Sequence, residues 1–286
     1  MTVKKSYLFV PATSEKMMGK AIVSDADCVI FDLEDAVAIH EKDMARERAK
    51  NFLINNPPQK DVYIRINDFT TPLWRNDIDA AIDSGAFGII VPKAENGINM
   101  YTICEYIKNR LECRGEGERI FEVLPLIETA RGVHFAYEIA NSHPFIARLV
   151  FGSIDYCLDL DCELTPGGDE LIYARSQIVN SSIAAGIENP VDAVFPDLSN
   201  EDDLYNEAIR AKRCGFKAKL AIHPKQLNTI HRVFTPTEDE MEEAREIVKA
   251  FEEAELSGIA SISVRNKLVD YPVYKKAKGL LQYSSK

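Results

Sequence analysis

Eight short apolar segments, separated by helix-like segments, are the feature that most constrains how this chain folds. Each segment is rich in Val, Ile, Leu and Phe and ends in polar or charged residues. Near-continuous hydrophobicity over so few residues is typical of a parallel strand that is buried on both faces. In chain order the segments are SYLFVPA from Ser6, CVIFDLED from Cys28, VYIRIND from Val62, GIIVPKAE from Gly88, EVLPLIET from Glu122, RLVFGSIDY from Arg148, AVFPDLS from Ala193 and KAKLAIHPKQ from Lys217.

The intervening segments have the pattern of amphipathic helices, with apolar residues three and four positions apart. Residues 43–56, 76–85 and 202–215 are examples, and Gly85 and Gly215 stand where a glycine commonly ends a helix. Strands that alternate with helices in this way predict an α/β fold, a (β/α)₈ TIM barrel.

A doubly wound open sheet is the alternative fold. Such a sheet normally carries a glycine-rich turn after its first strand, whereas this chain continues into Pro11-Ala12-Thr13-Ser14. The sequence contains neither GxGxxG nor GxxxxGK[ST]. The barrel is therefore the preferred prediction.

We predict a catalytic barrel domain over residues 1–235 and a C-terminal helical extension or lid over residues 236–286. Thr237 is expected to cap an acidic and then amphipathic helix, and the residues beyond Gly258 predict a strand or loop followed by a short helix. A barrel closes without this extension. The extension could therefore pack against the barrel, cover a site, or reach a neighbouring subunit.

Composition excludes several classes of function. The net charge of −11 argues against binding of nucleic acid or an acidic membrane surface as the main role. No apolar stretch approaches the roughly 18–20 residues that span a bilayer, and the first apolar run is too short for a signal peptide. A cytoplasmic location is expected. The six cysteines form no CxxC pair, which favours reduced thiols packed as small hydrophobic side chains.

Charged side chains gather at the predicted carboxyl ends of the strands, where the chemistry of a barrel takes place. Glu128 and Asp155 follow adjacent strands, so both can reach one ion. Two oxygen donors completed by water favour Mg²⁺ or Mn²⁺ over zinc, although salt bridges at the barrel rim are the alternative interpretation. The full set of polar strand-end residues is Asp32, Glu34, Asp35, Arg65, Asn67, Lys93, Glu95, Glu128, Asp155, Asp197, His223 and Lys225.

Arg65 is the most informative of these residues. A guanidinium inside a run that should be buried is costly unless carboxylates or a bound anion pair with it. Arg65 could bind an anionic substrate or could simply neutralise Glu34 and Asp35. His223, which precedes a proline, is more typical of a structural residue than of a base or ligand.

Several motifs together resemble those of a known family. They are LFVPA, IFDLEDAV, YIRIN, VPKAE, PLIET, FGSIDYCLDL, AIHPKQL and VDYP, in that order along almost the whole chain. The set resembles the citrate lyase β-subunit group, which includes citryl-CoA lyases, malyl-CoA lyases and related CoA-ester lyases of the aldolase/citrate lyase superfamily.

This resemblance implies a Mg²⁺-dependent barrel, with Mn²⁺ as the other candidate ion. It would cleave or form the carbon–carbon bond of a 3-hydroxyacyl-CoA such as citryl-CoA, malyl-CoA or citramalyl-CoA. The products of cleavage would be acetyl-CoA and an oxo-acid such as oxaloacetate. The implied partners are thus a CoA thioester and a small oxo-acid, and the implied assembly is a homotrimer or hexamer.

The resemblance also implies roles for residues. Glu128 and Asp155 match the metal carboxylates, and Glu128 thereby also takes part in substrate binding. Arg65 would hold the oxo-acid and its developing oxyanion. Two further catalytic residues, Glu34 and Asp35, would orient Arg65 and metal-bound water.

Asp270 in VDYP matches a C-terminal aspartate that enters a neighbouring subunit's site in malyl-CoA lyase relatives. The chain also departs from the family pattern. Pro11-Ala12 stands where Pro-Gly is common, which bears on contacts to the CoA phosphates. Asp159-Leu160-Asp161 replaces the family's DLG and adds a negative charge.

Two other functions stay open. One is a metal-dependent class II aldolase that acts on a free hydroxy-oxo acid, for which the VDYP tail would not be needed. The other is a non-catalytic barrel subunit of a lyase complex, against which the complete set of Arg, Glu and Asp positions argues.

Overall fold

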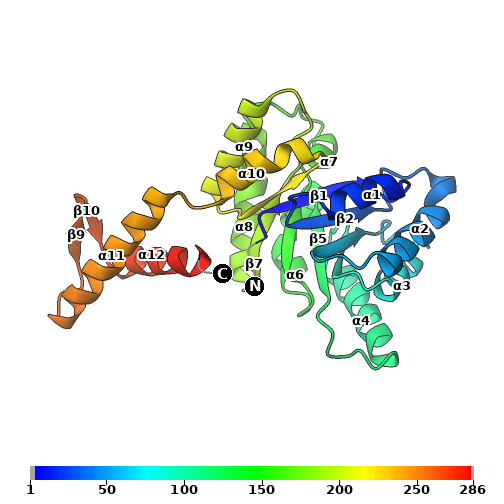
Figure 1. Ribbon diagram of the computed structural model, residues 1–286, viewed down its shortest axis with the longest axis horizontal. Helices are drawn as coiled ribbons and strands as arrows, with labels where there is room; N and C mark the ends of the chain where they lie inside the picture. The colour runs from blue at the N-terminus through cyan, green and yellow to red at the C-terminus, as the bar shows by residue number, and fades with distance from the viewer. Residues whose placement is uncertain (1–3, 285–286) are drawn as a thin grey trace. The chain divides into compact units, whose positions relative to one another are not determined.

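The computed structural model describes residues 4–284, and its central feature is a closed barrel of eight parallel strands (Figure 1). Each strand pairs with the next along the chain, and β8 pairs with β1 to close the barrel. The predicted (β/α)₈ barrel is confirmed, and the open sheet is wrong. The strands are β1 (Ser6–Pro11), β2 (Cys28–Asp32), β3 (Asp61–Arg65), β4 (Gly88–Val91), β5 (Glu122–Ile127), β6 (Arg148–Phe151), β7 (Glu188–Asp192) and β8 (Ala218–Ala221).

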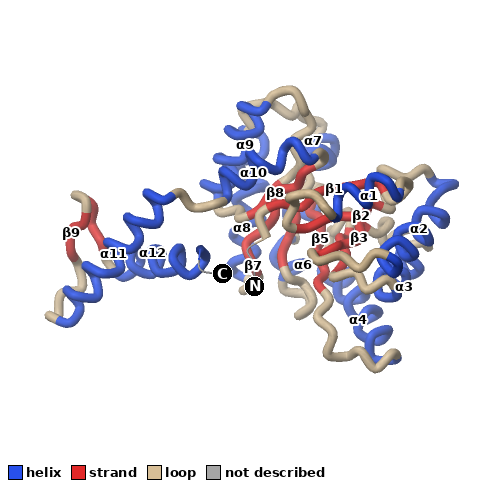
Figure 2. Tube along the Cα trace, viewed as in Figure 1, coloured by secondary structure: helices blue, strands red, loops and turns tan. Residues whose placement is uncertain are grey.

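Helices follow the strands and surround them in the barrel unit (Figure 2). The helix-like segments 43–56, 76–85 and 202–215 correspond to α2, α3 and α9. Gly85 and Gly215 follow α3 and α9 in left-handed backbone conformations, as predicted for glycines that end helices. The helices of this unit are α1 (Glu15–Ile22), α2 (Lys42–Asn55), α3 (Trp74–Asp83), α4 (Gly97–Cys113), α5 (Ala130–His134), α6 (Ala136–Ala140), α7 (Ser153–Asp159), α8 (Ile172–Ala184), α9 (Glu201–Cys214) and α10 (Leu227–Phe234).

The seventh strand was predicted at the wrong place. It is β7, Glu188–Asp192, whereas the predicted segment from Ala193 to Ser199 is a loop. Pro190 lies inside β7 and has no N–H group to donate to a neighbouring strand. In a sequence, such a proline argues against the prediction of a central strand. Asp197 consequently ends no strand, and its carboxylate accepts hydrogen bonds from Ser199 in an exposed turn.

The interior of the barrel is filled by side chains. Successive residues of a strand point to opposite faces, so alternate residues of each strand point inward. A filled barrel leaves no pore, and a ligand site is therefore expected outside the core, at the carboxyl ends of the strands. The buried inner residues are Tyr7, Cys28, Ile30, Tyr63, Ile90, Leu124, Leu126, Val150, Val191, Ala218 and Leu220.

A buried charge network joins β7 and β8 to the helices that cover them. Lys219 Nζ lies 2.7 Å from Asp192 Oδ2 and 2.6 Å from Glu207 Oε1. Arg175 Nε donates to Asp192 Oδ1 at 2.9 Å. The Lys219 and Asp192 side chains are fully buried, so removal of one partner leaves an uncompensated buried charge.

Replacement of Lys219 by Met should lower the free energy of unfolding by about 3–5 kcal/mol, because Asp192 and Glu207 would then share Arg175 alone. Urea unfolding followed by circular dichroism measures this loss. Lys267→Met is the matched control, since Lys267 pairs with Glu243 at an exposed position and should change stability little. Equal unfolding midpoints for the two variants would contradict this account.

A second compact unit begins at Phe234. It consists of α11 (Glu238–Leu256), the hairpin of β9 (Ile262–Val264) and β10 (Lys267–Val269), and α12 (Tyr271–Ser284). Thr237 caps α11 as predicted, in a reciprocal capping box with Glu240. The outermost residues of the two predicted domains, 1–3 and 285–286, lie outside the described residues. No helix within residues 4–284 is long and apolar enough to cross a bilayer.

Candidate active site

A cavity of about 560 Å³ opens at the carboxyl ends of the barrel strands, where the sequence predicted a site. The structure brings four predicted site residues together in its lining, which come from four different strand ends or loops. Glu34 lies beside them, whereas Asp270 belongs to the second unit. The charged lining residues are Asp32, Asp35, Arg65, Glu128 and Asp155, and the apolar ones include Phe9, Met17, Ile154, Val194 and Ile222.

Arg65 is held chiefly by Asp32. Arg65 Nε donates to Asp32 Oδ1 at 2.7 Å, and Nη2 donates to Asp32 Oδ2 at 2.6 Å, a two-pronged pair that fixes the guanidinium plane. Arg65 Nη1 faces the other two acids, 3.1 Å from Glu34 Oε2 and 3.4 Å from Asp35 Oδ2. Burial lowers the pKa of Arg65, but the hydrogen bonds and charge of Asp32 outweigh this effect and raise it above its usual value.

Sequence reasoning included Asp32 among the strand ends but missed its role. The pair follows from the parallel register of the structure, in which Asp32 and Arg65 are the last residues of adjacent strands and pair directly. The Asp32 carboxylate also accepts hydrogen bonds from the backbone N–H groups of Glu34 and Ala36, at 2.9 and 3.0 Å. Asp32 therefore organises both Arg65 and the turn that carries the next two acids.

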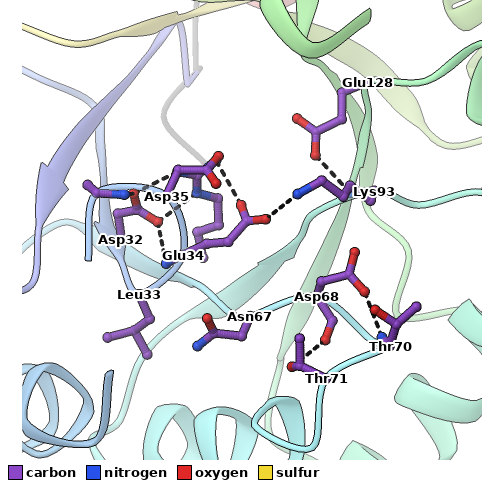
Figure 3. A network of polar contacts seen from close by, with 12 residues as sticks. Asp32, Leu33, Glu34, Asp35, Asn67, Asp68, Thr70, Thr71, Lys93 and Glu128 are labelled. Atoms are coloured by element: carbon purple, nitrogen blue, oxygen red, sulfur yellow. Dashed lines mark hydrogen bonds and ion pairs between the residues drawn. The ribbon is translucent and has the colours of Figure 1, made fainter. Parts of the chain in front are cut away.

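Lys93 connects Glu34 to Glu128 (Figure 3). Its Nζ lies 2.8 Å from Glu34 Oε1, and its backbone N–H donates to Glu128 Oε1 at 2.8 Å. Lys93 has a left-handed backbone with φ 48°, a conformation that costs energy for a residue with a Cβ. This strained position directs both the N–H group and the side chain toward the acids of the site.

Glu128 is a buried carboxyl group with an altered pKa. The pKa of Glu128 is raised to about 8, chiefly by burial and also by the negative charges of Glu34 and Asp155, while the hydrogen bond from the N–H of Lys93 acts in the opposite direction. Gly152 leaves room for this side chain, since a Cβ there would lie 2.7 Å from Glu128 Oε2. Glu128, Gly152 and Asp155 all line the same cavity.

The charges of the site fit a divalent cation. Within residues 4–284 no three His, Cys, Asp or Glu side chains converge on one ion position. Glu128 and Asp155 line the same cavity, and Mg²⁺ is commonly bound by one or two carboxylates with water or substrate completing its shell. When all are ionised, the five carboxyl groups of the site outnumber its three basic side chains by two negative charges, a state that the raised pKa of Glu128 disfavours without a cation. One divalent cation would balance them and lower the pKa of Glu128. The groups counted are Asp32, Glu34, Asp35, Glu128, Asp155, Lys42, Arg65 and Lys93.

His223 does not join the cavity lining. Its Nδ1 accepts a hydrogen bond from the backbone N–H of Lys225 at 3.1 Å and caps the short turn that follows β8. His223 thus makes a local structural contact of the kind predicted for it.

A closed parallel barrel with a charged cavity at the carboxyl ends of its strands is the architecture of (β/α)₈-barrel enzymes. The family model of HpcH/HpaI aldolase/citrate lyase matches residues 5–224. The chain belongs to this family.

Relatives and solved structures agree with this assignment. The chain is 33% identical to citrate lyase subunit beta of Leuconostoc mesenteroides subsp. cremoris, over 99% of this chain and 94% of that protein. It is 27% identical to mitochondrial citramalyl-CoA lyase of Rattus norvegicus, over 97% of this chain and 85% of that protein. The crystal structure of CitE from Mycobacterium tuberculosis in complex with magnesium, acetoacetate and coenzyme A is 27% identical, covers 99% of both chains and superposes with a TM-score of 0.81.

Proposed function

We propose that this protein is a Mg²⁺-dependent carbon–carbon lyase that acts on a 3-hydroxyacyl-CoA. Citryl-CoA, malyl-CoA and citramalyl-CoA are the candidate substrates, and acetyl-CoA and an oxo-acid are the products. The observation that carries the proposal is Arg65, held in plane by Asp32 in the same cavity as Glu128 and Asp155. The relatives with lyase names, and the magnesium, oxo-acid and coenzyme A of the CitE complex, support it.

The residues suit a retro-Claisen cleavage. The substrate hydroxyl transfers its proton to water and becomes a carbonyl, the carbon–carbon bond breaks, and its electron pair moves into an acetyl-CoA enolate. Arg65 would hold the oxo-acid half and stabilise negative charge on its oxygen, without reorganising, because Asp32 already orients the guanidinium. Glu128 and Asp155 would hold the Mg²⁺ ion, which would supply a Lewis acid beside the oxo-acid half.

Asp270 is the proposed acid and base at carbon. Its carboxyl group would protonate the enolate carbon in cleavage and remove the same proton in condensation. Asp270 follows β10 in the second unit, and we propose that it acts in the cavity of a neighbouring subunit. The active assembly would then be a homotrimer or hexamer, in which the second unit acts as a lid that excludes water from the enolate.

A substrate screen tests the proposal. The protein is incubated with citryl-CoA, malyl-CoA and citramalyl-CoA in the presence of Mg²⁺, and acetyl-CoA and the released oxo-acid are quantified. Cleavage of at least one ester is expected. Cleavage of free hydroxy-oxo acids alone would point to the class II aldolase, and the absence of both turnover and Mg²⁺ binding would point to a non-catalytic subunit.

Replacement of Arg65 by Lys should reduce turnover about 100-fold or more, because an ammonium group cannot reproduce the planar contact with two oxygens. Steady-state kinetics with the best ester from the screen measures this loss. Arg131→Lys, a change outside the residues that line the cavity, is the matched control and should keep normal turnover. Near-normal turnover of the Arg65→Lys variant would indicate that Arg65 only pairs with Asp32, Glu34 and Asp35 and takes no part in the reaction.

A further inference from the structure

Lys42 is a buried lysine beneath the turn that carries Glu34 and Asp35. It is the first residue of α2 and is 8% exposed. Its Nζ donates to the backbone carbonyl oxygens of Leu33 at 2.8 Å and of Glu34 at 2.5 Å. No sequence pattern had singled out this lysine.

The position of Lys42 is unfavourable for α2 itself. A cation in the first turn of a helix faces the positive end of the helix dipole, and burial of an ammonium group carries a further cost. Burial lowers the pKa of Lys42, and the negative charges of Asp32, Glu34 and Asp35 oppose this effect. Because α2 gains nothing from a lysine here, the reason for its place lies in the contacts it makes.

The contacts of Lys42 and those of Asp32 engage the same turn. Asp32 accepts the N–H groups of Glu34 and Ala36, while Lys42 donates to the carbonyl groups of Leu33 and Glu34. Both donors and acceptors of the turn are therefore engaged. Figure 3 shows this turn with Glu34 directed toward Lys93.

The position of the turn sets the position of Glu34. Glu34 Oε2 is buried without a hydrogen bond and lies 3.1 Å from Arg65 Nη1, so a small displacement of the backbone would change this contact. Asp32 holds the Nε and Nη2 edge of the guanidinium, and Glu34 and Asp35 face Nη1. The orientation of the Nη1 side of Arg65 thus depends on the position of the turn that carries Glu34 and Asp35.

We propose that Lys42 is a positioning residue for the oxo-acid site, which holds the turn at Leu33 and Glu34 and, through Glu34, orients the Nη1 side of Arg65. The assignment of the oxo-acid to Arg65 rests on the proposed function. The assignment of the turn to Lys42 rests on the contacts alone.

The test compares two lysine variants of the full-length protein. Lys42→Met keeps the length of the side chain and removes its charge and donors. Lys60→Met is the matched control, because Lys60 Nζ also donates to two backbone carbonyl groups, those of Ser24 and Ala26, in a loop outside the cavity lining. Lys42→Arg restores a cation with donors. Three quantities are measured: the thermal midpoint, amide hydrogen exchange of residues 33–37, and the dissociation constant of pyruvate, glyoxylate or oxaloacetate with Mg²⁺ present.

Both Met variants should lower the thermal midpoint. Only Lys42→Met should speed amide exchange of residues 33–37 by about tenfold or more and weaken oxo-acid binding by a similar factor, and Lys42→Arg should recover part of both. Unchanged exchange and unchanged binding in Lys42→Met, with a midpoint like that of Lys60→Met, would overturn the proposal. If the unaltered protein binds no oxo-acid, the proposed function fails, and the exchange measurement still decides the role of Lys42.

Discussion

Replacement of Glu128 by Gln is expected to lower the affinity for Mg²⁺ by at least about 100-fold, and to abolish lyase turnover with it. Loss of groups that only support metal ligands costs roughly 10–100-fold in affinity, so loss of a proposed ligand charge should cost more. The Gln side chain keeps an oxygen that can accept the Lys93 N–H at the position of Glu128 Oε1. The variant therefore removes charge and leaves the hydrogen bond. Isothermal titration with Mg²⁺ measures the effect.

The pH dependence of stability tests the raised pKa of Glu128 in the metal-free protein. The pKa of Glu128 is raised from 4.5 to about 8 in the folded protein. The metal-free protein should therefore lose stability as the pH rises between these values, and the Gln variant should lack this loss. Thermal unfolding with a chelator at about pH 5 and about pH 9 checks the sign of this change in stability.

Asp197→Asn is the control for the Mg²⁺ titration. It alters an exposed acid of a local turn and should bind Mg²⁺ normally. Unchanged Mg²⁺ affinity in Glu128→Gln would remove Glu128 from the metal site.

Replacement of Asp270 by Asn should reduce turnover by roughly 10²–10⁴-fold, the usual contribution of a general acid or base. Asp270 also caps α12, since its Oδ1 accepts a hydrogen bond from the N–H of Val273 at 3.2 Å. Asn is an equally good cap, so the variant removes the titratable carboxyl group and keeps the helix. Binding of Mg²⁺ and of the oxo-acid should stay normal, while release of acetyl-CoA falls.

Mixing experiments test whether Asp270 acts in a neighbouring subunit. Asp270→Asn is mixed with Arg65→Ala, and mixed oligomers that contain intact composite sites should recover part of the activity. Native mass spectrometry confirms that the subunits have exchanged. Activity that stays absent in exchanged oligomers would place Asp270 in the cavity of its own subunit or outside the chemistry.

The fold was largely predictable, and the exceptions have a physical cause. Seven strands lie where short apolar runs predicted them, because a strand buried on both faces must be apolar along its length. The strand β7 breaks this rule through Glu188, Asn189 and Pro190, while Val191 enters the barrel core and Asp192 is buried with Lys219. At Asp192 a buried ion pair with Lys219 takes the place of the apolar contacts made by the other strands. The sequence pattern does not indicate which two charged residues form such a pair.

The sequence by itself determined the barrel, the family and the set of charged strand ends, because these depend on periodicity and on motifs that are local in the chain. Tertiary structure alone decided which charges meet. Asp32 rather than Glu34 or Asp35 makes the two-pronged pair with Arg65, since parallel register places the last residues of β2 and β3 side by side. The contact of Lys42 with the Glu34 turn likewise requires α2 to pack beneath that turn. Distances of a few ångströms between side chains from separate strands set these interactions, and no spacing along the sequence encodes them.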